Sequence, residues 1–339
     1  MHEPISDSIR ALILALEQPA FLIRDGVILL SNERAPSAEE ALRSFLNRIP
    51  CPETASVTEG AWIFTMSPLG DLTLVQAKQA VSAPLPAATA QALRQPLSDL
   101  FAATHKLNPI FEDLEDEELF RSVSLMNRSM YRLLRSVLTI DTLRTEALPL
   151  RKEVMDLAEF LRTLCREAEY FFRAAGVGLC AELSERRIRI LADRQLLERS
   201  ILNLLSNAIR STPVGSDITI RLFVRGDQAI MEVRSTTSSP VSLSDFFSRG
   251  EDGPAEPDQG AGLGLPLVRR FAELHDGVFL LRPAADSVSA LLALPISRDS
   301  GAELRCPTPS VDYAGGHHHI LVELSDVLPI EVYSPLDIS

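Results

Sequence analysis

A long amphipathic pattern over residues 117–145 is the feature that most restricts how this chain can fold. Its apolar residues recur at steps of three and four, the spacing of one helix face; they are Leu119, Val123, Met126, Met130, Leu133, Leu134, Val137 and Ile140. A second helical pattern precedes it over residues 89–107 and carries Pro96. A lone hairpin of two such helices cannot cover both apolar stripes. We therefore expect a homodimer in which two hairpins form a four-helix bundle.

The hairpin is expected to form a domain over residues 81–150. A Pro/Ala-rich linker, VSAPLPAA at residues 81–88, begins it. An acidic run at residues 112–118 separates the two helices. Such a run is typical of a solvated turn, and acids at the start of the second helix suit the helix dipole.

Beyond the hairpin the hydrophobic period changes, which predicts an α/β domain over residues 151–296. Helices are expected at residues 156–175, 195–211 and 263–275. Strands are expected at residues 178–183, 187–192, 218–224, 229–233, 278–281 and 288–294. Residues 235–259 are rich in Ser, Thr, Pro, Gly and acids and indicate a loop, which at this length is usually functional.

Residues 1–80 are expected to form a small α/β unit. A helix is predicted at residues 9–16, and apolar runs on both sides of Asp25-Gly26 predict a β-hairpin. Two further strands are expected at residues 62–66 and 72–76. The complete chain is therefore assigned to the α+β class.

Composition narrows the kinds of partner. The 339 residues carry 46 acids and 33 bases, a formal net charge of −13, so a dedicated nucleic-acid binder is not expected. We find no apolar run long enough to span a bilayer and no signal peptide. Four cysteines lie far apart, which favours reduced thiols. These features predict a cytoplasmic protein without direct membrane insertion.

Two short motifs carry the chemistry. Asn203 and Asn207 lie four residues apart, so they share a helix face, and amide oxygens can complete a magnesium shell. Further along, GAGLGLPLV at residues 260–268 combines glycines, which let backbone amides approach phosphate, with the start of a helix. Each motif alone also fits a capping or packing role. Together, about 55 residues apart and in this order, they are specific.

This region resembles the ATP-binding domain of sensor histidine kinases, the Bergerat-type α/β sandwich shared with gyrase and Hsp90. The matching text is ILADRQLLERSILNLLSNAIRSTPVG, DFFSRG, GAGLGLPLVRRFAELHDGVF and VSALLALP. The hairpin resembles the family's dimerisation and phosphotransfer domain. Residues 1–80 resemble a PAS sensor domain more faintly, through PAFLIRDGVILLSNERA.

The resemblance implies Mg²⁺ with ATP or ADP as ligand and assigns site residues. Asn203 and Asn207 fall on the asparagine box, with Asn207 as magnesium ligand, and Arg210 falls where a basic residue faces the phosphates. Phe247 falls on the phenylalanine box. The second glycine box and its neighbours supply the remaining nucleotide-binding positions, Gly260, Gly262, Leu263, Gly264 and Leu265.

The phosphoacceptor motif departs from the family pattern. Gln91 stands in place of the acceptor histidine, and an amide nitrogen is not nucleophilic. Ala92 replaces the neighbouring acid, and Gln95 stands where the family has a residue that orients water. No catalytic residue is therefore intact, although Gln95 leaves residual phosphatase action open. His105 is the alternative acceptor in the hairpin, about 21 Å along the helix from residue 91.

The base-recognition motif departs as well. Ser235 stands where an aspartate of the first glycine box accepts a hydrogen bond from the adenine amino group. A missing buried partner costs roughly 1–3 kcal/mol, which is about 5- to 150-fold in affinity. A hydroxyl can recover part of this, so we expect weakened nucleotide binding.

Residues 297–339 lie beyond the family's usual end and form a tail of unknown role. His317, His318 and His319 are expected in a solvated loop, with a metal site as the alternative. The segment from Ile320 to Val332 is expected to be strand-like and to pack on the ATP-type domain or on a partner.

The leading hypothesis is a dimeric two-component signalling protein that binds Mg-ATP or Mg-ADP, is impaired in histidine autophosphorylation, and acts on a response regulator or partner kinase. One alternative is a non-catalytic dimeric scaffold without nucleotide. Another is an ATP-dependent protein kinase that uses a different acceptor.

Overall fold

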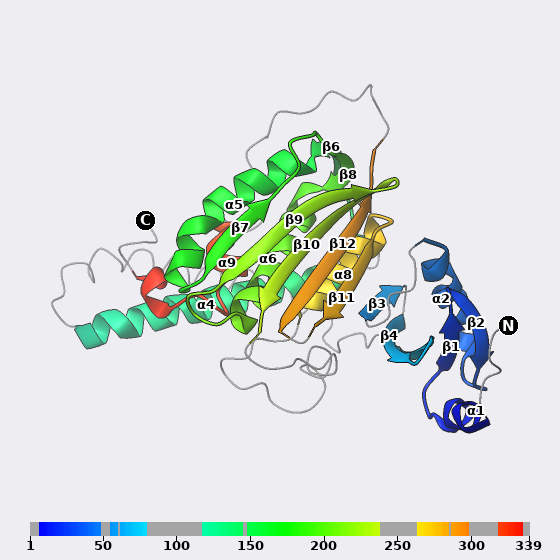
Figure 1. Cartoon of the computed structure of the whole chain (residues 1–339). Helices are drawn as coiled ribbons and strands as arrows, with labels where there is room; N and C mark the ends of the chain where they lie inside the picture. The colour runs from blue at the N-terminus through cyan, green and yellow to red at the C-terminus, as the bar shows by residue number, and fades with distance from the viewer. Residues whose placement is uncertain are drawn as a thin grey trace.

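The structure is a computed structural model of the 339-residue chain. It describes residues 7–48, 55–59, 62–79, 117–144, 148–237, 263–284, 286–297 and 318–334. The described residues form a mixed α/β architecture, shown in Figure 1.

A ten-stranded sheet forms the backbone of the described residues, in the order β2-β1-β5-β4-β3-β11-β12-β10-β9-β7. The C-terminal half of this sheet consists of β7 (Gly178–Glu182), β9 (Asp217–Arg225), β10 (Gln228–Thr236), β11 (Val278–Pro283) and β12 (Ser287–Pro295). Neighbouring strands are antiparallel except for the parallel pair β7–β9. All five strands were predicted from the sequence, and β9 and β10 show the alternation of buried and less buried residues that is typical of a strand with one covered face.

Three helices cover one face of this half-sheet (Figure 1): α5 (Leu157–Ala174), α6 (Arg194–Ser211) and α8 (Gly264–Leu274). Aspartates fix the start of the first two. Asp156 accepts a hydrogen bond from Ala158 N at 3.1 Å, and Asp193 accepts one from Leu196 N at 3.1 Å. The unpredicted strand β6 (Lys152–Asp156) pairs with β8 (Arg189–Asp193) in a separate two-stranded sheet.

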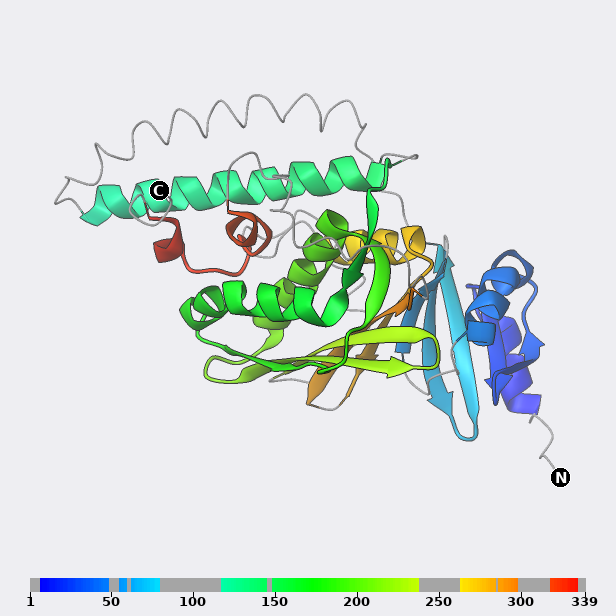
Figure 2. The same ribbon diagram turned by 90° about the horizontal axis from the view of Figure 1, so that it is seen from above.

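Helix α4 (Glu117–Arg144) lies over the helical layer, on the side away from the sheet (Figure 2). Its bounds confirm the prediction of a long helix. The predicted apolar stripe divides, however: Val123, Leu134 and Val137 are buried, whereas Leu119 and Leu133 are exposed in the monomer. Met126 is exposed as well. The first helix of the predicted hairpin, residues 89–107, lies outside the described residues.

The N-terminal half of the sheet is formed by β1 (Ala20–Arg24), β2 (Val27–Ser31), β3 (Ala55–Glu59), β4 (Trp62–Leu69) and β5 (Leu72–Gln79). The β1–β2 turn is as predicted, because Asp25 and Gly26 have φ of 50° and 79°, which suits a type I′ hairpin. The helices are α1 (Asp7–Ala15) and α2 (Pro36–Arg48). The prediction missed α2 and β3.

The two halves share one sheet because β3 pairs with β11, with Val57 opposite Leu280. Val278, Leu280 and Ala293 of the C-terminal half join the N-terminal hydrophobic core. This edge-to-edge pairing was not foreseen from the sequence.

The tail differs from its prediction. The expected strand between Ile320 and Val332 is wrong: the segment forms α9 (His319–Glu323) and a 3₁₀ helix, η1 (Ile330–Tyr333). It lies between α4 and the helices below, as Figure 2 shows. Apolar residues on several of its turns reach the main core, which an alternating strand could not achieve here; they are Ile320, Leu321, Val322, Leu324, Leu328, Val332 and Tyr333.

The expectation of a solvated histidine loop holds for His318, which is exposed and precedes α9 at its N-cap position without a side-chain capping bond. Its ring centroid lies 5.3 Å from that of Phe171. The expectation is wrong for His319, which begins the helix and is half-buried. His317 lies outside the described residues. Among the residues that the structure describes, no cluster of three or more His, Cys, Asp or Glu is placed to hold a metal ion.

Burial lowers the pKa of His319 to about 4, with help from His318 and Arg194. Glu198 and Glu167 lie 3.5 Å and 3.7 Å from its Nε2, but they do not outweigh burial. Since the unfolded chain titrates near 6.5, it binds the proton first as the pH falls. The free energy of unfolding should therefore decrease between pH 6.5 and about 4, by about 1.4 kcal/mol per pH unit.

The variant His319→Gln should lack this component. Urea unfolding at pH 7.5 and pH 5.0 should show a loss of stability that is about 2 kcal/mol larger in the parent chain than in the variant. Equal losses in the two chains would contradict the placement of a neutral, buried imidazole.

No described helix has the length and apolar character needed to cross a membrane.

Candidate functional site

Helix α6 carries the predicted polar residues on one face. Asn203, Asn207 and Arg210 follow each other at steps of four and three residues, so they line up along the helix. The start of α6 is fixed by Asp193, whose backbone N–H donates to His275 Nε2 at 2.9 Å while its carboxylate caps the helix. The face is therefore rigidly oriented toward α8 and β10.

A pocket lies between α6, the start of α8 and the sheet. It is lined by Leu204, Asn207, Ala208, Ser211, Val233, Ser235, Leu265, Leu281, Val288 and Ala290. Three predicted residues from three separate segments meet here, namely Asn207, Ser235 and Leu265. The lining is apolar apart from one amide and two hydroxyls, which is the character of a site for a flat, mostly apolar ring.

Asn207 has unused hydrogen-bonding capacity at this pocket. Its buried Nδ2 has no hydrogen-bond partner. The two ends of an Asn amide are exchanged by a flip of the side chain, so either the oxygen or the nitrogen can be turned toward a ligand. An amide oxygen is a suitable ligand for Mg²⁺. The residue therefore fits the predicted magnesium role.

Ser235 is buried at the same pocket and lies 3.1 Å from Ser211, Oγ to Oγ. The Ser211 hydroxyl donates within α6, to Ala208 O at 3.1 Å and Asn207 O at 3.2 Å. Either hydroxyl can donate in this pair; when Ser211 directs its single hydrogen to α6, Ser235 is the donor. In both arrangements Ser235 Oγ keeps a lone pair for a ligand, as a neutral acceptor where the family pattern has a carboxylate.

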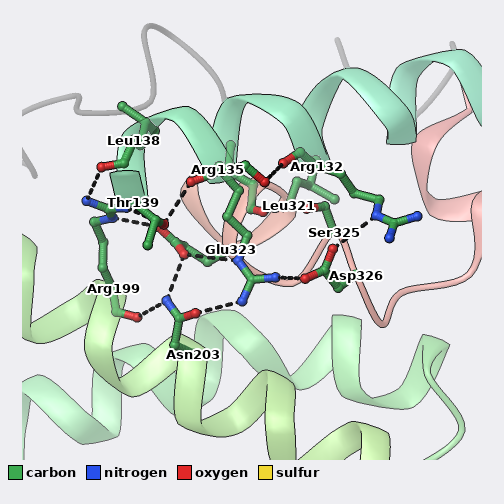
Figure 3. A network of polar contacts seen from close by, with 12 residues as sticks. Arg132, Arg135, Leu138, Thr139, Arg199, Asn203, Leu321, Glu323, Ser325 and Asp326 are labelled. Carbon is green, nitrogen blue, oxygen red and sulfur yellow. Dashed lines mark hydrogen bonds and ion pairs between the residues drawn. The ribbon is translucent and has the colours of Figure 1, made fainter. Parts of the chain in front are cut away.

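Asn203 is engaged elsewhere, as Figure 3 shows. Its Oδ1 accepts from Arg135 Nη2 of α4 at 2.6 Å. Its Nδ2 donates to Arg199 O at 2.8 Å and to Glu323 Oε2 of the tail at 3.0 Å. The side chain is 1% exposed. The structure thus places Asn203 in a contact between three segments and not at the pocket.

Glu323 is the centre of that contact. It is fully buried and pairs with Arg199 Nε at 2.7 Å and with Arg135 Nε at 3.5 Å. Arg199 also donates to Thr142 Oγ1 at 2.8 Å and Thr139 Oγ1 at 3.1 Å, both on α4. Carboxylate and guanidinium groups from the tail, α4 and α6 therefore compensate each other's burial.

Arg210 lies 3.8 Å from Asp326 of the tail, Nη2 to Oδ2. The same carboxylate accepts a hydrogen bond from Arg132 Nε at 3.0 Å and pairs with Arg135. In this structure the predicted phosphate-facing residue contacts an acid of its own chain.

The start of α8 brings three more predicted residues to α6. Leu263 precedes the helix, Gly264 begins it and Leu265 lines the pocket. A Cβ added at Gly264 would lie 2.6 Å from Asn203 Oδ1, so only glycine permits this approach. The remaining sequence-predicted positions lie outside the described residues: Gln91, Ala92, Gln95, His105, Phe247, Gly260 and Gly262.

Sequence reasoning missed Ser211, Arg135, Glu323 and Asp326. One signal was present in the tail, since Glu323 interrupts the apolar run ILVEL and a buried acid needs a buried partner. Nothing in the sequence indicated that α4 and α6 would supply that partner.

Comparisons with known proteins support the interpretation of this region. A family model described as "Histidine kinase-, DNA gyrase B-, and HSP90-like ATPase" matches residues 192–303. The chain is 32% identical over 155 residues to the histidine protein kinase DivJ of Caulobacter vibrioides, covering 44% of this chain and 26% of DivJ. It is 32% identical over 165 residues to the sensor histidine kinase HprS of Escherichia coli, covering 48% of this chain and 34% of HprS.

Among solved structures, full-length ShkA in complex with AMPPNP matches with a TM-score of 0.50 at 21% identity. The match covers 62% of this chain and 45% of ShkA. It concerns the fold. The chain spans less than half the length of DivJ, HprS and ShkA.

Proposed function

We propose that this chain, which belongs to the sensor histidine kinase family, is a signalling protein that binds a magnesium–nucleotide complex weakly and does not phosphorylate itself on histidine. Its output would be to control a response regulator or a partner kinase. The domain boundaries near residues 80, 150 and 296, the PAS-like nature of the N-terminal unit and dimerisation through the hairpin are parts of this proposal.

The observation that carries nucleotide binding is the pocket between α6, α8 and the sheet. Asn207, Ser235 and Leu265 come from three separate segments, line one pocket, and are all assigned to nucleotide binding by the family resemblance. Asn207 also brings to the wall of this pocket a buried amide nitrogen that has no hydrogen-bond partner. Its oxygen would hold Mg²⁺, which when bound neutralises phosphate charge.

The base preference follows from the hydroxyl pair. With the Ser211 hydrogen directed to α6, Ser235 donates to Ser211 and offers lone pairs to the base, which suit the 6-amino group of adenine and not the 6-oxo group of hypoxanthine. A neutral hydrogen bond contributes about 1 kcal/mol, so the preference for ADP over IDP should be about fivefold. Ser235 also replaces a charged acceptor, which supports weak binding.

The absence of histidine phosphorylation rests on residue 91. A glutamine amide cannot attack the γ-phosphorus of ATP, because its nitrogen lone pair is delocalised into the carbonyl. Phosphoryl transfer would then need an acceptor elsewhere in the chain or in a partner.

Two measurements on the full chain test the proposal. Calorimetric titration with Mg-ADP should give a dissociation constant between micromolar and millimolar, and Mg-IDP should bind about fivefold more weakly. Incubation with γ-labelled ATP should leave no acid-labile label on the protein.

Each outcome separates the hypotheses. No heat at millimolar Mg-ADP would leave only the scaffold. Acid-labile label that disappears in His105→Ala would overturn the claim of lost histidine phosphorylation. Acid-stable label would indicate a kinase that uses another acceptor.

A second candidate function, a scaffold without nucleotide, is favoured by one observation. The amide oxygen of Asn203, in the asparagine box, accepts a hydrogen bond from Arg135, and its amide nitrogen donates to Arg199 O and to Glu323. In this chain Asn203 therefore has a structural role, because it links α6 to α4 and to the tail and its amide is not turned to a nucleotide.

A further inference from the structure

The C-terminal tail, residues 318–334, makes its polar contacts with the same face of α6 that is assigned to the nucleotide. Asn203 lies one turn before Asn207 on this face, and Arg210 lies one turn after it. The tail contacts both: Glu323 accepts from Asn203, and Asp326 lies 3.8 Å from Arg210. Only Asn207, between them, lines the pocket.

The tail is held firmly against α4 by contacts that do not involve α6. The rings of Tyr131 and Tyr333 lie 5.4 Å apart, and Asn127 Nδ2 donates to Tyr333 O at 3.1 Å. Arg128 Nε donates to Ser325 O at 3.2 Å. The tail can therefore remain on α4 while its contacts with α6 change.

Asp326 is the acid that bridges the two sides. Arg132 and Arg135 of α4 bind it closely, as Figure 3 shows for Arg135, and Arg210 Nη2 of α6 lies 3.8 Å from its Oδ2. Its side chain is 12% exposed, so its charge is only partly screened by water. A carboxylate in this position presents to Arg210 the same kind of oxygen anion as a phosphate group.

We propose that the tail is an autoinhibitory element in which Asp326 competes with the phosphates of the nucleotide for Arg210. This inference rests on the proposed nucleotide function. Binding of the nucleotide phosphates would draw Arg210 away from Asp326, and the contact between the tail and α6 would weaken. By linkage, whatever releases the tail from α6 strengthens nucleotide binding by the same factor.

The device also connects the nucleotide to α4. Glu323 and Asp326 both pair with Arg135 of α4, the helix of the predicted dimerisation hairpin. A loss of the Arg210–Asp326 contact would therefore change the surroundings of Arg135. The tail thus joins the face of α6 on both sides of Asn207 to α4 through charged side chains, in a chain whose own phosphoacceptor position carries glutamine.

The first test is a substitution with a matched control in the same tail. Asp326→Asn keeps the shape of the side chain and removes the charge that faces Arg210. Glu331→Gln makes the same chemical change at an exposed position of η1. Calorimetry with Mg-ADP should show binding that is three- to tenfold tighter in Asp326→Asn and within twofold of the parent chain in Glu331→Gln, with folding checked by circular dichroism.

The second test needs no substitution. Hydrogen exchange of the parent chain should become faster in the tail when Mg-ADP is added, because Asp326 loses one of its arginines. Slower exchange in the tail with nucleotide would overturn the inference.

The outcomes of the titration are distinct. Equal affinities for Asp326→Asn and the parent, or an equal gain in Glu331→Gln, would overturn competition at Arg210 while leaving nucleotide binding intact. Mg-ADP binding by Asp326→Asn, with none by the parent chain or Glu331→Gln, would support competition strong enough to prevent binding in the parent chain. No binding by any of the three chains would overturn the proposed nucleotide function and this inference together.

Discussion

Replacing Glu323 by alanine should lower the free energy of unfolding by about 3–5 kcal/mol. The carboxylate is fully buried and shared by Arg199 and Arg135, whose side chains are 5% and 10% exposed. Its removal takes the shared carboxylate from Arg199 and Arg135, of which Arg135 keeps its pair with Asp326, and deprives Asn203 of an acceptor. The cost is therefore that of breaking a buried ion pair, which exceeds the value of an ordinary surface ion pair.

Urea unfolding followed by circular dichroism at pH 7.5 measures this effect. Glu331→Ala is the matched control, because the same residue type is exposed in the same tail, and its change should stay within about 0.5 kcal/mol. Glu323→Gln should fall between the two, since an amide fills the space and keeps one acceptor oxygen. A loss below 1 kcal/mol in Glu323→Ala would contradict a buried clamp between the tail, α4 and α6.

Replacing Asn207 by alanine should weaken Mg-ADP binding by about 10- to 150-fold, the range for a lost bond to a charged group. The reason is specific to this residue: its amide is the one of the asparagine pair that lines the pocket and has a buried atom without a hydrogen-bond partner. Stability should change little, since within the described part of the chain no neighbour loses a hydrogen bond to the Asn207 amide.

The dependence on magnesium separates a ligand from a packing residue. In the parent chain, removal of Mg²⁺ with EDTA should weaken ADP binding, whereas the affinity of Asn207→Ala should be nearly the same with and without the ion. If the variant keeps the full dependence on Mg²⁺, Asn207 does not hold the metal.

Local structure was predictable where the sequence pattern and the tertiary environment act in the same direction. The strands β9 and β10 alternate around Gly226-Asp227, and α6 starts directly after a capping Asp193, so their bounds follow within three residues. The tail was predicted wrongly because a short apolar run with polar interruptions fits a strand as well as a one-turn helix. Packing against α4 decided between them.

The candidate site divides in the same way. Asn207, Ser235 and Leu265 could be assigned because the resemblance to sensor histidine kinases places them at positions of the family's nucleotide-binding motifs, with Ser235 in place of an aspartate. The equivalent assignment of Asn203 and Arg210 did not foresee the tail, whose acids approach from more than 100 residues away in the chain. Long-range charge pairing leaves no local signal in the sequence, because an acid that forms a buried ion pair is the same residue type as an acid that is exposed to solvent.

By itself, the sequence determined the α/β pattern of residues 151–296, the long helix α4 and the residue types at the pocket, because these depend on periodicity, caps and motif spacing. Only the tertiary structure decided that β3 extends the sheet through β11, that Ser211 and Ser235 pair at the pocket, and that the tail lies between α4 and α6. Each of these depends on which segments distant in the chain come into contact, and that is settled by the shape and charge of complete surfaces.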